Sequence, residues 1–200
     1  MAEHLVLVRH GQIAANREGR WHGSTDSPLT WRGSRQAKRT AKHLSKRLQP
    51  IEKIYVSPLD RCRSTAAPIA SAFKIDPVIH HDLREWGIGA WEDTPFSDLQ
   101  KTHDFMGKVR KDPHFEPPGG GESLAQVTTR MVAAIRQINA SHEGAVAIVS
   151  HGASLALALA VLLDNDANSW GQYLVDNCSL TELVLGDNPY VNFFNRTEHL

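Results

Sequence analysis

Apolar runs without polar alternation recur along this chain, and each ends at residues that can carry chemistry. Residues 5–8 lead into an Arg-His-Gly triplet at 9–11, and residues 145–149 lead into Ser-His-Gly at 150–152. A shorter run at 54–56 breaks at a proline shortly before an arginine. Runs of this kind are typical of parallel strands that are covered on both faces. The pattern therefore predicts three buried strands.

Amphipathic patterns between these runs predict helices. One stripe with helical spacing begins next to Thr30, the expected N-cap, and a second spans residues 124–138. Residues 154–163 indicate a buried helix, and Ser179 to Leu185 and Tyr190 to Phe194 indicate late edge strands that could be antiparallel. The first stripe consists of Leu29, Ala37, Ala41, Leu44 and Leu48, and the second of Leu124, Val127, Met131, Ile135 and Ile138.

Strand and helix signals alternate through residues 1–200 without internal repeats, as expected for a single α/β domain. We predict a three-layer α/β/α sandwich with a mainly parallel central sheet. Ligands bind beyond the carboxyl ends of strands in such sheets, so Arg9, His10, Arg61 and His151 should line one crevice. The fork of arginine matches phosphate oxygens, and the amides that open a helix at Gly152 add a positive dipole end. The crevice is therefore predicted to bind a phosphoryl group.

These motifs, in this order and spacing, resemble the histidine phosphatase superfamily, the phosphoglycerate mutase-like family. The resemblance covers nearly the whole chain and implies the fold of that family. The matching text comprises Arg9-His10-Gly11 with Asn16, the stretch from Gly23 through Asp26 and Pro28-Leu29 to Gly33, residues 57–66, Leu83-Arg84-Glu85 with residues 89–92, residues 119–123, and Ser150-His151-Gly152.

The resemblance implies covalent phosphoryl transfer, in which neutral His10 attacks phosphorus while Arg9, Arg61 and His151 hold the phosphate oxygens. One nitrogen of His10 must stay unprotonated, and its other N–H needs an acceptor that the sequence does not identify. His151 is expected to act best as a cation. Family position makes Glu85 the acid and then the base, in preference to Asp82, Glu92 and Asp93. The further expected phosphate or substrate contacts are Asn16, Gln12, His22, Gly23 and Gly152.

Other phosphate chemistries are excluded on spacing, and the implied mechanism needs neither a metal nor a cofactor. Cysteine-dependent phosphatases need an arginine six positions after the cysteine. In this chain that position holds Pro68 after Cys62 and Val184 after Cys178. The chain contains no Gly-x-x-x-x-Gly-Lys loop and no His-Glu-x-x-His metal motif.

Residues 86–121 follow the expected acid and are predicted to form a lid or substrate-specificity insertion. Its aromatic residues are expected mostly in the core, and four of its cations could meet a second anionic group. Mutases of the family carry a tyrosine three residues after the acid, a pair of adjacent arginines and a longer insertion, whereas this chain has Ile88 and no such pair. The four cations are Lys101, Lys108, Arg110 and Lys111.

The expected function is therefore hydrolysis of a small phosphorylated substrate by a histidine acid phosphatase-type phosphomonoesterase. One alternative is a bisphosphoglycerate-dependent phosphoglycerate mutase. A more remote one is a non-catalytic phospholigand-binding module, which would be expected to lose His10, Glu85 or His151.

Composition narrows the class of partner. The chain has 22 basic and 22 acidic residues, so no net charge attracts polyanions. The first predicted helix is strongly basic, but we interpret it as a solvated face and expect no nucleic-acid partner. Its cations are Arg32, Arg35, Lys38, Arg39, Lys42, Lys46 and Arg47.

The remaining features concern location and assembly. The longest apolar stretch, residues 155–163, is too short to cross a bilayer, so no membrane association is expected. Two cysteines and no signal region favour the cytoplasm. The sequence leaves the oligomeric state open, although Tyr190, Phe193 and Phe194 could contribute to a dimer contact.

Overall fold

A computed structural model describes residue 2, residues 4–46 and residues 50–200. Arg47 and Leu48, which the sequence pattern assigned to the first helix, lie outside the described residues. Within the described part of the chain, six strands form one sheet in the order β3-β2-β4-β1-β5-β6. Their bounds are β1 Leu5–Arg9, β2 Ile51–Val56, β3 Val78–Ile79, β4 Ala145–Ser150, β5 Leu180–Val184 and β6 Tyr190–Arg196.

The sheet is mainly parallel, as predicted. Strand β4 pairs in parallel with β1 and β2, and β2 pairs in parallel with β3. The two late strands are antiparallel: β5 pairs with β1, and β6 pairs with β5. Only β6 of this pair lies at the sheet edge, so the prediction of an edge position is wrong for β5. Because β5 runs against β1, its amino end lies at the edge where the parallel strands end.

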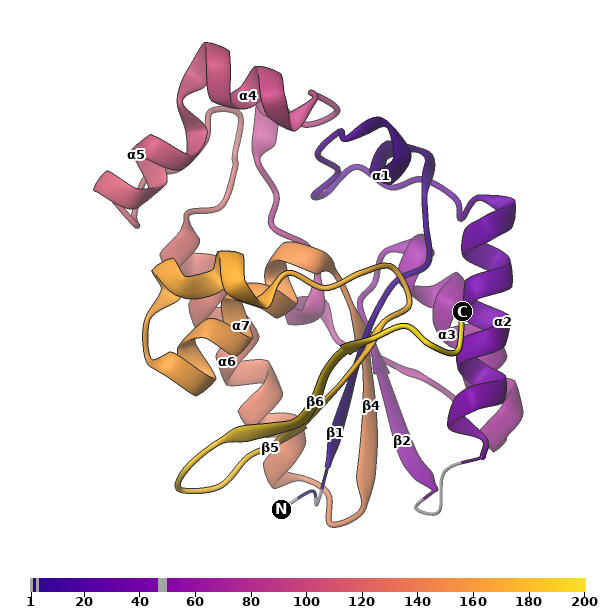
Figure 1. The fold of residues 1–200 in the computed structure, drawn as a ribbon. Helices are drawn as coiled ribbons and strands as arrows, with labels where there is room; N and C mark the ends of the chain where they lie inside the picture. Colours follow the sequence, from indigo (N-terminus) through magenta and orange to yellow (C-terminus); the bar gives the residue numbers. More distant parts are fainter. Residues whose placement is uncertain (1, 3, 47–49) are drawn as a thin grey trace.

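Helices cover both faces of the sheet, which confirms the three-layer architecture (Figure 1). Leu5 and Leu7 of β1 belong to a core cluster with α6 and α7, whereas Val6 and Val8 belong to a second cluster with α2 and α3. Alternate side chains of a strand point to opposite faces, so burial on both faces explains the unbroken apolar run. The helix bounds are α2 Trp31–Leu44, α3 Asp60–Phe73, α6 Leu124–Ala140 and α7 Gly152–Asp164.

Local signals explain where these helices begin. The Thr30 side chain accepts a hydrogen bond from the Gly33 N–H and caps α2, as predicted. Ser123 and Gln126 form a reciprocal capping box at the start of α6. Helix α7 is buried along most of its length, as its continuous apolar run indicates.

Beyond the carboxyl ends of the parallel strands lie shorter elements (Figure 1). Residues 86–121 contain three of these elements, η2, α4 and α5, and Trp86, Trp91 and Phe105 are buried in the core beneath them. None of the helices among the described residues is long and apolar enough to cross a membrane. The shorter elements are α1 Ala14–Glu18, η1 His81–Leu83, η2 Gly89–Trp91, α4 Phe96–His103, α5 Phe105–Lys111 and η3 Ala167–Tyr173.

Candidate active site

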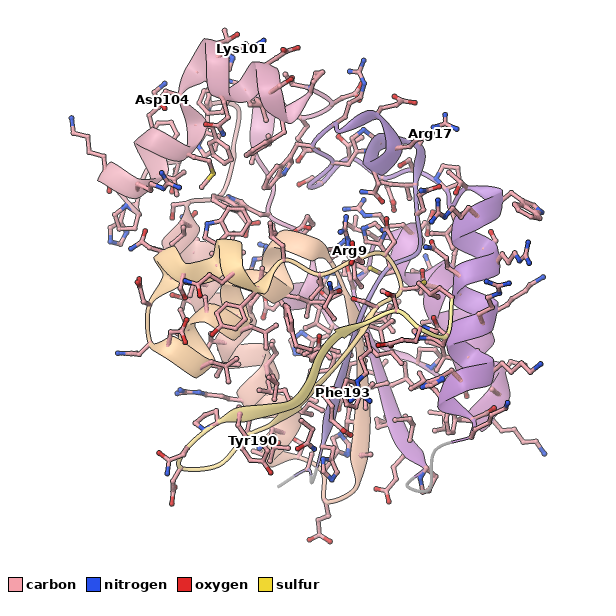
Figure 2. The ribbon with its side chains drawn as sticks, viewed as in Figure 1. Arg9, Arg17, Lys101, Asp104, Tyr190 and Phe193 are labelled. Carbon is pink, nitrogen blue, oxygen red and sulfur yellow. The ribbon has the colours of Figure 1, made fainter. Side chains whose placement is uncertain are left out.

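The two neighbouring strands β1 and β4 bring both histidines of the sequence motifs together. Arg9 at the end of β1 is in register with Ser150 at the end of β4. His10 and His151 follow directly, and their ring centroids lie 5.2 Å apart. Arg9 lies centrally at this end of the sheet (Figure 2). The parallel register alone therefore creates a paired imidazole site.

The His10 ring is held in one tautomer. Its Nδ1–H donates to the Gly11 carbonyl oxygen at 2.8 Å, which is the acceptor that the sequence could not identify. None of the described residues forms a hydrogen bond with Nε2. Burial, and then the charges of Arg9 and Arg61, hold the pKa of His10 well below its usual value. His10 is therefore a neutral imidazole at pH 7, with Nε2 unprotonated and free to attack.

Arg9 has a donor without a partner. Its Nη1 donates to the Val175 carbonyl oxygen at 2.6 Å, whereas its buried Nε has no hydrogen-bond partner among the described residues. Gly152 makes room for this group, because a Cβ at Gly152 would lie 3.2 Å from both Cζ and Nε of Arg9. Since a buried unpaired N–H is costly, the Nε–H of Arg9 marks a place for a bound acceptor.

The Glu85 carboxylate is fixed against the amino end of α7. Its Oε1 accepts from the Trp86 N–H at 2.8 Å and the Ser154 N–H at 2.9 Å. The Ser154 hydroxyl shares its single proton between this oxygen at 2.8 Å and the Arg84 carbonyl oxygen at 2.9 Å. Its Oε2 accepts from the Ala153 N–H at 3.1 Å and from no other group in the described part of the chain. The nearby acids Asp82, Glu92 and Asp93 are engaged elsewhere. Oε2 of Glu85 can therefore accept a further hydrogen bond or carry a proton.

Arg61 is buried and satisfied by protein acceptors. Its Nε donates to Nδ1 of His151 at 3.2 Å. Its Nη1 donates to the Thr25 carbonyl and the Asp26 carboxylate, and its Nη2 to the carbonyl oxygens of His22 and Gly23. All five N–H groups of Arg61 therefore have protein acceptors.

The expectation that His151 is a cation is wrong for this structure. Nδ1 accepts from Arg61, so the ring proton lies on Nε2, which donates to the Ser57 hydroxyl at 2.7 Å. Burial, and then the neighbouring Arg61, keep the pKa of His151 well below its usual value. His151 is a neutral ring that bridges Arg61 and Ser57.

Asn177 is a site residue that the sequence analysis missed. Asn16 accepts the Ile13 N–H at 3.1 Å through its Oδ1, so its amide Nδ2 is left to donate. The Asn177 amide donates at 3.0 Å to that same Oδ1 and at 3.0 Å to the His10 carbonyl oxygen. Asn177 lies shortly before β5, whose antiparallel direction brings its preceding loop to the catalytic edge. A search of residues before the late strands could have found it.

A cavity of about 240 Å³ opens over these groups. Its polar lining includes Arg9, His10, Asn16, His22, Glu85 and Gly152. Its apolar wall consists of Ile13, Trp21, Phe96, Ala153, Trp170 and Leu174, and Arg20 completes the lining. The arrangement combines a neutral nucleophile, a free arginine donor and a carboxylate around one small space.

Two predicted contact residues lie outside this cavity. The Gln12 side chain accepts from the Thr30 hydroxyl at 3.1 Å and lines a separate groove. A Cβ at Gly23 would come within 2.2 Å of the Trp86 carbonyl oxygen, so this glycine permits close packing between two loops. Neither Gln12 nor Gly23 belongs to the lining of this cavity, because side-chain direction and loop packing, which motif spacing does not show, place them elsewhere.

The four cations of residues 86–121 also lie outside the cavity. Lys101, Lys108, Arg110 and Lys111 are absent from its lining, and Lys101 lies on the outer helices in Figure 2. Lys108 instead stacks over the rings of Trp91 and Phe115. The cation that does line the cavity besides Arg9 is Arg20, which pairs with Glu18 and Asp93.

His22 stands in the cavity wall and is anchored to Asp93. Its Nε2 lies 3.0 Å from Asp93 Oδ1, and this hydrogen bond lowers the pKa of Asp93. Within the described residues, no group of three or more histidine, cysteine, aspartate or glutamate side chains could hold a metal ion.

The chain belongs to the histidine phosphatase superfamily (branch 1), whose family profile matches residues 5–195. It is 32% identical over 200 residues to phosphoserine phosphatase 1 of Hydrogenobacter thermophilus, covering 98% of this chain and 93% of the relative. It is also 33% identical over 192 residues to a probable phosphoglycerate mutase of Yersinia enterocolitica, covering 94% and 87%.

A solved structure shares the fold closely. Phosphoserine phosphatase from Entamoeba histolytica, crystallised with 3-phosphoglyceric acid, superposes with a TM-score of 0.86 at 25% identity and covers 98% of each chain. The relatives support phosphatase activity, and thus a phosphoric monoester hydrolase.

Proposed function

We propose that this protein is a metal-independent phosphomonoesterase that acts on a small phosphorylated metabolite through a phosphohistidine on His10. The observation that carries the proposal is the His10 ring, whose Nδ1–H is fixed on the Gly11 carbonyl while Nε2 is left free at the cavity. An unprotonated, oriented imidazole is what a phosphoryl transfer needs in its nucleophile.

In the first step, His10 Nε2 forms a bond to phosphorus as the ester oxygen leaves. The Arg9 Nε–H, the Asn16 amide and the first N–H of α7 at Gly152 are proposed to hold the phosphoryl oxygens. The leaving oxygen takes a proton from Glu85. We assign that proton to Oε2, because Oε1 accepts two backbone N–H groups whereas Oε2 accepts one.

In the second step, the Glu85 carboxylate takes a proton from water as the water oxygen bonds to phosphorus. The bond to His10 Nε2 breaks, phosphate leaves, and Glu85 is protonated again for the next cycle. The acid and base roles need only one carboxylate, and the structure holds that carboxylate beside the helix amides.

Arg61 and His151 are proposed to act differently from the direct oxygen contacts implied by family resemblance. The buried charge of Arg61 lowers the pKa of His10 and adds positive potential below the phosphoryl group. Direct contact would require Arg61 to release one of its loop acceptors. His151 is proposed to orient Arg61 through its Nδ1.

The size of the cavity supports a small substrate. A space of about 240 Å³ suits a compact phosphomonoester such as phosphoserine or a phosphoglycerate. Ile88 is fully buried at the position where the mutases carry a tyrosine, which favours hydrolysis over mutase activity. We keep the cytoplasm as the proposed compartment, because Cys62 and Cys178 are both free thiols.

The test measures phosphate release from phosphoserine, both phosphoglycerates and other phosphomonoesters in the presence of a chelator. We expect release by the wild type, none by His10→Ala, and unchanged release by the control His114→Ala at an exposed site. With labelled substrate, a trapped phosphohistidine should form in the wild type and in His114→Ala but not in His10→Ala.

Two outcomes would overturn the proposal. Interconversion of the phosphoglycerates after priming with bisphosphoglycerate, without net phosphate release, would establish the mutase instead. Binding of phosphomonoesters without any phosphohistidine would establish a non-catalytic phospholigand-binding module.

A further inference from the structure

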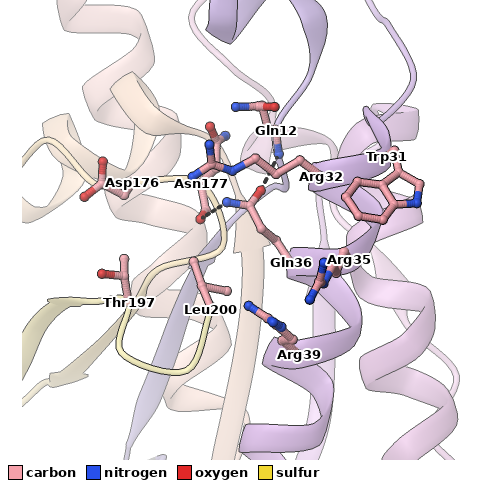
Figure 3. Close-up of a pocket in the computed structure, with 10 residues that line it drawn as sticks. All are labelled: Gln12, Trp31, Arg32, Arg35, Gln36, Arg39, Asp176, Asn177, Thr197 and Leu200. Atoms are coloured by element: carbon pink, nitrogen blue, oxygen red, sulfur yellow. Dashed lines mark hydrogen bonds between the residues drawn. The ribbon is translucent and has the colours of Figure 1, made fainter.

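A second hollow, separate from the catalytic cavity, runs along helix α2 (Figure 3). Arg32, Arg35 and Arg39 form one side, and the opposite side comes from the loop at residues 176–177 and from Thr197 and Leu200. We call this feature the arginine groove. Its volume is about 670 Å³, and it shares no lining residue with the catalytic cavity.

The three arginines concentrate positive charge in a chain that is neutral overall. Helix α2 contains no aspartate or glutamate, and its arginines occupy positions i, i+3 and i+7. Neighbours at this spacing repel one another when they carry like charges. Among the described residues, no carboxylate forms an ion pair with any of the three. The helix therefore keeps an unfavourable arrangement that a bound anion would relieve.

Other contacts prepare the groove for a ligand. The Arg35 guanidinium lies 5.4 Å from the ring centroid of Trp31, a stacking contact that restricts its orientation. Asp176 adds a carboxylate to the lining, and its Oδ2 accepts a hydrogen bond at 3.0 Å from the amide of Asn195, which lies outside the groove. In Figure 3, Arg35 and Arg39 lie against helix α2, whereas the Arg32 side chain reaches across toward Asn177. The groove thus carries three exposed cations, and one of them is held against Trp31.

Spacing indicates which anion would fit. Side chains three or four residues apart on a helix have Cβ atoms roughly 5–6 Å apart, which suits two adjacent phosphoryl groups better than one. Arginine also binds phosphate oxygens in pairs. The groove is larger than the catalytic cavity, so it can hold a ligand bigger than the substrate.

The groove is connected to the catalytic groups. Gln12 lies two residues after the nucleophile His10, and its backbone N–H donates at 3.0 Å to Oε1 of Gln36, which lines the groove. Asn177 lines the groove while its amide holds the His10 carbonyl and Asn16. A ligand that shifts this wall would alter the phosphate-binding amide of Asn16.

We propose that the arginine groove binds a small organic anion with two or more phosphoryl groups, and that its occupancy changes substrate binding in the catalytic cavity. The second half rests on the proposed phosphatase function, whereas the first half does not. The chemistry of the groove selects the ligand by its paired phosphoryl groups, and a single phosphate would engage only part of the surface.

Binding is tested by calorimetry with ADP and pyrophosphate, with orthophosphate as the single-phosphoryl comparison. Orthovanadate fills the catalytic cavity throughout. We expect one ADP per chain, and affinity reduced about tenfold or more in Arg35→Gln/Arg39→Gln, since each lost arginine removes a charge-assisted contact. The control Lys38→Gln/Lys101→Gln removes the same charge from exposed positions outside the groove and should bind as the wild type does.

Equal ADP affinity in the arginine variant and the wild type would overturn the site, as would equal affinity of the wild type for ADP and orthophosphate. Circular dichroism and the melting temperature check that both double variants fold, and an unfolded arginine variant is replaced by Arg32→Gln alone. Failure of the phosphatase proposal would leave these binding results intact.

Coupling is tested by phosphate release. Saturating ADP should change KM for the best phosphomonoester in the wild type and in the lysine control. The arginine variant retains any direct competition at the catalytic cavity, so it provides the baseline. A KM response identical in the arginine variant and the wild type would refute the coupling.

Discussion

Asn177 offers a direct test of how this site is organised, because it touches the reaction only through other residues. Replacing Asn177 with alanine removes its hydrogen bonds to the His10 carbonyl and to Asn16 Oδ1, both 3.0 Å long. Each bond contributes about 0.5–1.5 kcal/mol net, so the free energy of unfolding should fall by about 1–3 kcal/mol.

The larger effect should be on catalysis. Without Asn177, the Asn16 oxygen keeps its hydrogen bond from the Ile13 N–H but loses the second one, so the amide is held less firmly and its donor is less well aimed at the phosphate. Loss of one oriented donor, worth about 1.4–2.7 kcal/mol in the transition state, corresponds to a fall in kcat/KM of about 10- to 100-fold. The assay is phosphate release from the best phosphomonoester, with thermal unfolding in parallel and Asn168→Ala, at an exposed position of η3, as the control.

A double-mutant cycle with Asn16→Ala decides whether Asn177 works through Asn16. If it does, Asn16→Ala/Asn177→Ala should lose little more kcat/KM than Asn16→Ala alone, because the two residues act as a unit. Fully additive losses would refute the reasoning and assign Asn177 a general structural role.

Four further predictions concern the nucleophile, the pH dependence of stability, the arginine donor and the acid. Because burial lowers the pKa of His10, kcat/KM should not fall as pH drops through 6.5, and a pH profile with an acid limb centred at that value would contradict the assignment. The pKa values of His10 and His151 are both lowered in the folded protein, so below about pH 6.5 the unfolded chain binds protons that the folded protein does not. The free energy of unfolding measured with urea should therefore decrease as pH falls below about 6.5. Gly152→Ala should displace the Arg9 guanidinium and raise KM several-fold. The control is Gly171→Ala, whose added Cβ has no neighbour within 4 Å and should leave KM unchanged. Equal KM values for the two variants would show that Arg9 Nε does not bind the phosphate. Glu85→Gln should lower kcat by about 10²- to 10⁴-fold while vanadate affinity stays within a few-fold, and unchanged turnover would eliminate Glu85 as the acid.

The sequence was sufficient to predict the layers of the fold. Residues 5–8 and 145–149 are apolar at every position, and this pattern is typical of a strand that is covered on both faces, as β1 and β4 are. The helical stripes and the capping signals at Thr30 likewise depend on residues close in the chain. Parallel strands end at one edge, so the meeting of His10 with His151 followed from the same pattern.

Tertiary structure decided the contacts that depend on loop paths and side-chain directions. Gln12 is two residues from His10, yet its side chain points to the arginine groove rather than the catalytic cavity. Arg61 lies at the edge that its motif predicted, but the carbonyl oxygens of residues 22–25 occupy most of its donors. No periodicity encodes such loop packing, because it depends on distances between segments far apart in sequence.

Asn177 shows the same limit most clearly. It lies 161 residues from Asn16 in the chain, and the antiparallel direction of β5 is what brings the two side chains within 3.0 Å. Strand direction in turn depends on which connections can pack over the sheet. The sequence by itself thus determined the fold class, the strand ends and the types of reactive group, whereas only the folded chain determined which donors are free, because hydrogen bonds form or fail according to three-dimensional distance and angle.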